Sequence, residues 1–177
     1  MKKKILITGG SGYLAGSISS FLSQYKNYEV SVCSSSNIES KHGEGNILKV
    51  DWNKKSSLRN ICKGKDIIIH CASPDADFSK KYPEASYEFS GKMLDSFLNE
   101  AVHCKVKKFI YFSSAHVYQL KHEGVLDEKS PINPQHPYGV SKKIAEQTLF
   151  NKKELIEINI IRLSNAFGIP SNKNLNC

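Results

Sequence analysis

The alternation of short apolar runs with amphipathic stretches constrains the fold of this chain most strongly. Apolar runs at residues 4–8, 28–33, 47–50, 66–70, 109–112 and 158–161 predict strands, and amphipathic stretches at residues 12–25, 84–103 and 135–150 predict helices. A run that is apolar throughout, such as residues 67–69, is typical of a strand buried on both faces. Strands that alternate with helices form right-handed crossovers and a parallel sheet. We therefore expect an α/β fold, a doubly wound parallel sheet with strand order 3-2-1-4-5-6 and helices on both faces.

Length and composition agree with one globular domain over residues 1–177. Hydrophobic residues make up 40% of the chain and charged residues 24%, and a chain of this length buries a core without cross-links. No apolar run approaches the ~18–20 residues that span a bilayer, and the run at residues 5–7 is too short for a secretory signal. Five cysteines without a CxxC pair disfavour a zinc site or a disulfide framework and favour a reducing, cytoplasmic location.

The formal net charge of +8 comes almost entirely from lysine, because Arg59 and Arg162 are the only arginines. Arginine is the residue best suited to bidentate contacts with bases and phosphates, and the lysines are scattered along the chain in pairs. The charge therefore predicts a solvated basic surface, with no nucleic-acid partner and no membrane partner. A basic surface of this kind still steers anionic small molecules toward a protein.

A glycine-rich turn joins the first predicted strand to the first predicted helix, with the sequence TGGSGYLA at residues 8–15. Gly9 permits a sharp turn, and Gly12, one residue after Ser11, lets backbone amides approach a ligand closely. A helix that begins near Gly12 directs its free N–H groups and positive dipole end toward an anion. A plain loop is the alternative, but the position between strand and helix predicts a site for the pyrophosphate of a dinucleotide.

The ends of the second and third strands bear on the choice between NAD and NADP. A carboxylate at the end of the second strand holds the ribose of NAD, but here that strand ends in Ser34, Ser35 and Ser36. No carboxylate there repels the 2′-phosphate of NADP, and this absence favours NADP slightly. No arginine follows to neutralise that phosphate, however, so NAD and NADP both remain possible. Asp51, with Trp52 beside it, is placed either to accept a hydrogen bond from adenine or to cap a turn.

Tyr138 and Lys142, four residues apart in the third predicted helix, form the candidate catalytic pair. Residues at i and i+4 share one face of a helix, and a lysine near a phenol stabilises the phenolate and lowers the pKa. Ser114 follows the fifth strand, where side chains face the ligand crevice of such sheets, so we expect it to hydrogen-bond a substrate oxygen. A serine hydrolase is disfavoured because the chain has no G-x-S-x-G elbow.

Three histidines, His116, His122 and His136, cluster in the sequence without H-x-x-x-H spacing or supporting carboxylates. They predict surface or pocket-rim positions, and we expect no metal site. His116, which lies nearest to Ser114, is a candidate substrate contact.

Several ordered motifs resemble the extended short-chain dehydrogenase/reductase family, in particular its nucleotide-sugar epimerase/dehydratase branch, over residues 4 to about 170: TGGSGYLA, Asp51, IIIHCAS, KKFIYFSSAHVY, PQHPYGVSKKIAE and IIRLSNAFG. The resemblance implies a Rossmann fold, NAD or NADP as cofactor and a nucleotide-sugar substrate. It also implies a homodimer as the expected assembly. It implies hydride transfer with a Ser114, Tyr138 and Lys142 triad in which Tyr138 is the acid/base. It also implies pyrophosphate contacts from Gly9, Gly12, Tyr13 and Leu14, further cofactor contacts from Cys71, Ala72, Ser73, Leu163 and Ser164, and a substrate contact from Asn165.

Three positions depart from the pattern of that family. Ser90 stands where an asparagine is usual beside the cofactor, Ser34 replaces the acid that binds ribose, and Gln119 replaces a glycine. Family members also carry a smaller lobe that holds the nucleotide-sugar, so the resemblance implies that residues 1–177 lack a C-terminal substrate lobe.

Three functions remain open at this point. The first is an NAD(P)-dependent epimerase or dehydratase that acts on a nucleotide-sugar. The second is a dinucleotide-binding fragment without independent catalysis, and the third is a reductase of a non-sugar carbonyl, which would share the core motifs.

Overall fold

Six parallel strands form a single sheet at the centre of the molecule. The structure, a computed structural model, describes residues 1–36, 46–119 and 124–168. The strands are β1 (Lys3–Thr8), β2 (Tyr28–Ser34), β3 (Asn46–Lys49), β4 (Ile67–His70), β5 (Lys108–Ser114) and β6 (Glu157–Leu163). They lie in the order β3-β2-β1-β4-β5-β6, and every neighbouring pair is parallel. The predicted strand order is therefore confirmed.

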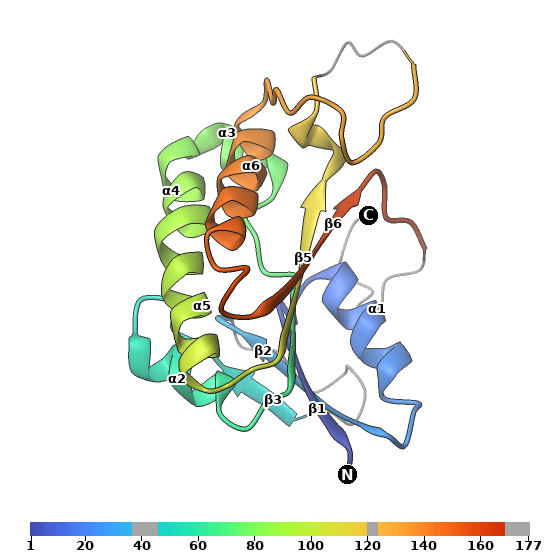
Figure 1. Ribbon diagram of the computed structural model, residues 1–177, viewed down its shortest axis with the longest axis vertical. Coiled ribbons are helices and arrows are strands. Elements are labelled where there is room, and N and C mark those ends of the chain that lie inside the picture. The colour runs from blue at the N-terminus through green and yellow to red at the C-terminus, as the bar shows by residue number, and fades with distance from the viewer. Residues whose placement is uncertain (37–45, 120–123, 169–177) are drawn as a thin grey trace.

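Helices cover both faces of the sheet (Figure 1), as predicted. Helix α1 (Tyr13–Leu22) lies on one face, and α2 (Lys55–Cys62), α5 (Leu94–His103) and α6 (Pro137–Phe150) lie on the other. Side chains alternate along β1, so Leu6 joins the core beneath α2, α5 and α6, whereas Ile5 and Ile7 join the core beneath α1. This two-sided burial is the reason for the continuous apolar runs in the sequence.

The sequence analysis missed two short helices. The first, α2, has Leu58, Ile61 and Cys62 buried at helical spacing, but the rest of its eight residues are polar or charged. The second, α3 (Ala76–Lys81), buries only Ser79 and begins at Asp75, whose side chain accepts a hydrogen bond from Phe78 N. Neither segment has enough apolar residues to give a clear helical period.

The helix predicted at residues 84–103 is present but interrupted. It consists of α4 (Pro83–Glu88), a π-helical turn η1 (Phe89–Met93) and α5. Single π-turns of this kind are often found at functional sites. No helix in the described parts of the chain has the length and apolar character needed to cross a membrane.

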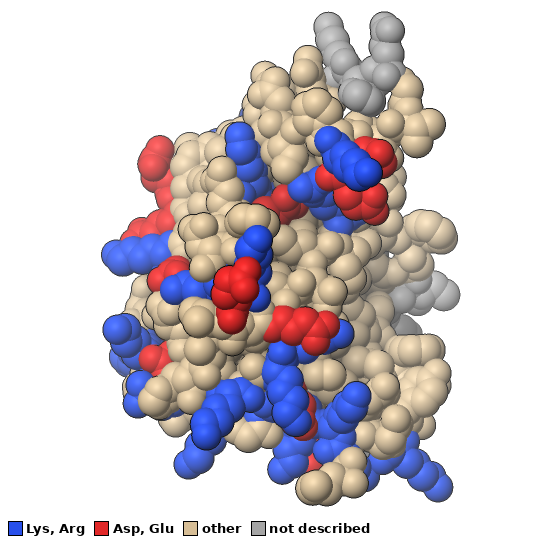
Figure 2. Space-filling model, in the orientation of Figure 1, with Lys and Arg blue, Asp and Glu red and all other residues tan. Residues whose placement is uncertain are grey.

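Many of the lysines lie where the strands begin. Figure 2 shows blue side chains gathered along the lower end of the molecule, where β1 starts. Lys107 pairs with Asp66 at 3.2 Å and Lys108 pairs with Glu157 at 2.7 Å, at the starts of β4, β5 and β6. Ligands bind at the opposite, carboxyl ends of such sheets. This basic surface therefore lies away from the end of the sheet where a cofactor would bind.

Strand β6 is an edge of the sheet, because it pairs with β5 alone among the described strands. Ile161, in the middle of this strand, is 40% exposed. Its neighbour Arg162 points to the other face and is mostly buried, with an 18% exposed side chain. The edge strand thus has one packed face and one open face.

Candidate active site

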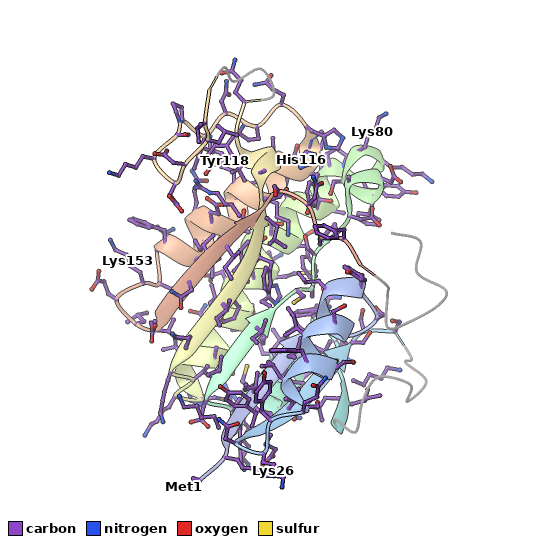
Figure 3. All side chains as sticks on the ribbon, turned by 90° about the vertical axis from the view of Figure 1, so that its right-hand side faces the viewer. Met1, Lys26, Lys80, His116, Tyr118 and Lys153 are labelled. Carbon is purple, nitrogen blue, oxygen red and sulfur yellow. The ribbon has the colours of Figure 1, made fainter. Side chains whose placement is uncertain are left out.

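Two adjoining cavities form a crevice at the carboxyl ends of β1, β4 and β5. The first has a volume of about 280 Å³ and the second about 460 Å³. Both are lined by Gly9, Gly12, Cys71, Ser73 and Pro74, so the glycine turn runs along the whole crevice. Figure 3 shows His116 and Tyr118 at this end of the molecule, opposite Met1 and Lys26.

The glycine turn brings the ends of β1 and β4 into close contact. Gly9 has a φ of +76°, and a Cβ there would lie 2.8 Å from the amide nitrogen of Ala72. Gly12 caps α1 without a side-chain hydrogen bond, and a Cβ on it would lie 3.2 Å from the carbonyl oxygen of Gly9. Within residues 1–36, 46–119 and 124–168, no capping side chain accepts from the first amides of α1, and this arrangement suits a pyrophosphate.

Replacing Gly9 with alanine should destabilise the fold more than the same change at Gly64. Both glycines have positive φ, so both substitutions carry a backbone cost of about 1–2 kcal/mol. A Cβ at Gly64 meets nothing within 4 Å, whereas a Cβ at Gly9 meets the backbone of Cys71 and Ala72. Urea unfolding of the two variants would measure the difference, and equal losses would show that the close approach of β1 to β4 is not needed.

The first cavity is lined by several of the residues that were predicted to contact the cofactor. Ser11, Ser34, Trp52 and Ala72 line it, and so does Phe89, which the sequence analysis had assigned only to a helix face. Ser34 is 4% exposed, and its hydroxyl accepts from Ser36 N at 3.2 Å and shares a hydrogen bond with Ser36 Oγ at 3.0 Å. The indole of Trp52 packs edge-on against Phe89, with ring centroids 5.3 Å apart, so aromatic rings form one wall.

Two predicted cofactor contacts lie outside both cavities. Asp51 is a turn residue, because its carboxylate accepts from Asn53 N at 3.0 Å and pairs with Lys54 Nζ at 3.2 Å. This is the second of the two alternatives drawn from the sequence. Ser90 is buried in η1 beneath the crevice, beside Ala72, Ser73 and Phe89.

The second cavity brings the three candidate catalytic residues together. It is lined by Ser114 from the end of β5, by Tyr138 and Lys142 from α6, by Tyr13 and Leu14 from α1, and by Leu163, Ser164 and Asn165 from the end of β6. Lys142 is 4% exposed, and among the described residues it is the only lysine or arginine that lines the crevice.

The sequence predicted that Lys142 lowers the pKa of Tyr138, but the pKa of this phenol is raised. Burial raises the pKa of Tyr138, and a hydrogen bond from Ser114 acts in the opposite direction. Burial also lowers the pKa of Lys142 to about 8. The ammonium of Lys142 donates to the carbonyl oxygen of Phe112 at 2.9 Å, and it lies 5.4 Å from the centre of the Tyr138 ring. Burial has the largest effect on the pKa of Tyr138, and Lys142 is not among the groups that shift it.

Two histidines lie beside Tyr138. His136 caps α6, since its Nδ1 accepts from Tyr138 N at 3.2 Å. His116 lies at the rim of the cavity, where its Nδ1 is 3.0 Å from Ser114 Oγ and its ring packs edge-on against Tyr138. A Cβ at Gly139 would overlap the carbonyl oxygen of His116, so α6 and the turn after β5 fit closely. His122 lies outside the described residues.

A buried ion pair behind the catalytic residues was not found from the sequence. Glu146 on α6 and Arg162 on β6 make a bidentate pair, with Nη2 to Oε2 at 2.7 Å and Nε to Oε1 at 3.0 Å. Ser113 donates to Glu146 Oε1 at 2.5 Å, and Arg162 also donates to the Tyr118 hydroxyl at 2.7 Å. Through Ser113 and Arg162, this ion pair ties β6 to β5 and α6, the two elements that carry the candidate catalytic residues. The one sequence signal for this ion pair was the position of Glu146 one helical turn after Lys142, on the same face of α6.

The chain matches the NAD dependent epimerase/dehydratase family over residues 5–175. It is 29% identical over 185 residues to dTDP-D-glucose 4,6-dehydratase of Homo sapiens, covering 94% of this chain and 52% of the relative. It is 27% identical over 176 residues to a putative UDP-glucose 4-epimerase of Methanocaldococcus jannaschii, covering 93% of this chain and 56% of the relative. The chain therefore spans about half the length of the curated relatives it matches.

A solved structure shares the fold. UDP-glucose 4-epimerase from Brucella ovis, determined in complex with NAD, superposes with a TM-score of 0.83 at 22% identity, covering 92% of this chain and 52% of that one. The family match over residues 5–175 leads to one assignment. This chain belongs to the NAD-dependent epimerase/dehydratase family.

Proposed function

We propose that this chain binds NAD or NADP and forms the catalytic half of an enzyme that epimerises or dehydrates a nucleotide-sugar. The observation that carries the proposal is the position of Ser114, Tyr138 and Lys142 on one cavity that also contains the glycine turn. The family match and the similarity to an epimerase and a dehydratase support it. We also propose a homodimer and a cytoplasmic location, the latter supported by free thiols at Cys33, Cys62, Cys71 and Cys104.

The crevice would hold the cofactor along the glycine turn. Gly9, Ser11 and Gly12 would contact the pyrophosphate, because the open amides of α1 face it. Ser34 and Trp52 would border the adenosine. Cys71, Ala72, Ser73 and Leu163 would complete the walls, and no acidic side chain of the described residues lines the first cavity.

When bound, the cofactor supplies hydride acceptance and return at a sugar carbon. The residues of this chain supply orientation and proton transfer. Ser114 would hydrogen-bond the reacting oxygen, and Tyr138 would take the hydroxyl proton as general base. Lys142 would supply positive charge beside the phenol. His116 and Asn165 line the same cavity on the side where a substrate would enter.

Cofactor binding can be tested through Trp52, the only tryptophan of the chain. Because the indole lines the first cavity, titration with NADH or NADPH should quench its emission, and comparing the two affinities would choose between the cofactors. The matched control is the double variant Trp52→Phe/Phe150→Trp, which moves the single tryptophan to an exposed site on α6. Emission that is unchanged while NADH binds by equilibrium dialysis would contradict the placement of the adenosine.

Turnover separates the remaining alternatives. A panel of UDP- and dTDP-hexoses, with products separated by chromatography, should show interconversion or loss of water. Dinucleotide binding without any turnover would favour a binding module, the second candidate. Turnover of non-sugar carbonyls alone would favour a reductase.

A further inference from the structure

We propose that His70 is a positioning residue for the dinucleotide, because through the hydroxyl of Thr8 it fixes the backbone amide of Ala72 in the wall of the crevice. The inference rests on the proposed function, in which that crevice holds NAD or NADP. Neither Thr8 nor His70 lines either cavity of the crevice. Their effect on the cofactor must therefore pass through Ala72.

Three groups meet where β1 and β4 end. Thr8 and His70 are the last residues of the two strands and are partners in the parallel register. Thr8 Oγ1 lies 2.8 Å from His70 Nδ1 and accepts a hydrogen bond from Ala72 N at 3.2 Å. Ala72 lines the first cavity, and its amide nitrogen is the atom closest to the position of a Cβ on Gly9. One hydroxyl thus connects the imidazole to the wall that faces the glycine turn.

Burial determines where the hydroxyl proton of Thr8 points. Thr8 is fully buried and His70 is 2% exposed, so this proton needs an acceptor inside the protein. Oγ1 already accepts from Ala72, and within residues 1–36, 46–119 and 124–168 its only hydrogen-bond partner that can accept is His70 Nδ1. Burial also lowers the pKa of His70 to about 3, so the ring is neutral at pH 7. The hydroxyl therefore donates to Nδ1, and the ring proton is on Nε2.

Aromatic rings hold the imidazole against Thr8. Four of them lie around it, with centroids 5.4–5.9 Å from its own: Trp52, Phe97, Phe109 and Tyr111. Packed in this way, the imidazole keeps Nδ1 directed at Thr8, and a lone pair of the hydroxyl stays directed at Ala72. The crevice wall is thereby held in one position before a ligand binds, and such preorganisation increases affinity.

The first test changes Thr8 in two ways and measures cofactor affinity. Equilibrium dialysis with NADH and NADPH is the suitable method, since the emission of Trp52 would also respond to changes at His70. Thr8→Val keeps the shape of the side chain but removes the hydroxyl. It should raise the Kd of the preferred cofactor about 3–10-fold, the range of one net hydrogen bond. Thr8→Ser keeps the hydroxyl and is the matched control, so it should leave Kd within about twofold.

The second test changes the imidazole. His70→Phe removes the acceptor but keeps an aromatic ring, so it should raise Kd by the same factor as Thr8→Val. Combining the two substitutions should cause no further loss, because both residues act through a single hydrogen bond. Phe109→Leu is the matched control, since it loosens the packing on the same imidazole without removing that bond. It should lower the free energy of unfolding and leave Kd unchanged, which separates positioning from a purely structural role.

Nuclear magnetic resonance of the His70 ring adds a measurement that needs no variant. The ¹⁵N shifts should show Nδ1 unprotonated and Nε2 protonated in the chain without ligand. A neutral ring with its proton on Nδ1 would overturn the inference even if the variants at His70 failed to fold. Unchanged affinity in Thr8→Val and His70→Phe, or losses that add in the double variant, would also overturn it. A wild-type chain that binds neither NADH nor NADPH would instead contradict the proposed function.

Discussion

Tyr138→Phe should lower turnover of a nucleotide-sugar by about 10²–10⁴-fold, which is the usual contribution of a positioned acid or base. The substitution removes the only atom of the side chain that exchanges a proton and keeps the ring that packs against His116. Steady-state kinetics at saturating cofactor would measure the loss. Because the phenol lines the second cavity and not the first, the affinity for NADH should change little in the Trp52 emission assay.

The matched control for this prediction is Tyr25→Phe, at a tyrosine that is 45% exposed between α1 and β2 and does not line the second cavity. It should keep full turnover. If Tyr138→Phe retained turnover within a factor of about ten, the acid/base would have to be another group. If it lost NADH binding as strongly as turnover, the phenol would serve the cofactor and not the substrate.

Glu146→Ala should cost about 3–5 kcal/mol of unfolding free energy, because it leaves the guanidinium of Arg162 without its partner in a poorly hydrated site. The side chain of Arg162 is 18% exposed and that of Glu146 is 9% exposed. Ser113 would lose its acceptor as well. Urea denaturation, followed by circular dichroism, would measure the change.

Two further variants sharpen the interpretation of that loss. Glu88→Ala breaks an exposed pair with Lys92, in which the side chains are 53% and 82% exposed, and should cost no more than about 1 kcal/mol. Adding Arg162→Met to Glu146→Ala should recover part of the loss, because no unpaired buried charge then remains. A Glu146→Ala variant as stable as Glu88→Ala would show that water replaces the carboxylate at little cost.

The strand order was predictable because apolar runs alternate with amphipathic stretches along the chain, and the central strands β1 and β4 are buried on both faces. The helices were less predictable. Helix α2 depends on Leu58 and Ile61 for its packing, and two such residues give no clear period over eight positions. The π-turn η1 lies inside one continuous amphipathic stretch, and it does not interrupt the apolar pattern. The sequence therefore predicted one helix where the structure has three consecutive segments.

Within the site, spacing predicted which residues meet but not how their charges are balanced. The i, i+4 relation correctly indicated that Tyr138 and Lys142 share a cavity. It carried no information on the Phe112 carbonyl, which holds the Lys142 ammonium and comes from a different strand. The pairing of Glu146 with Arg162 likewise depends on how α6 lies against β6, which local sequence does not specify.

The edge strand β6 has a practical consequence for work with this chain in solution. Its outer side pairs with no other described strand and so offers backbone N–H and C=O groups to an extended segment, and Ile161 adds an apolar contact on the open face. Glu157, which is exposed in the same strand, is a charged residue of the kind that discourages such pairing. Aggregation at high protein concentration is therefore expected to begin at β6, and added charge on its open face should raise the concentration at which the chain stays dispersed.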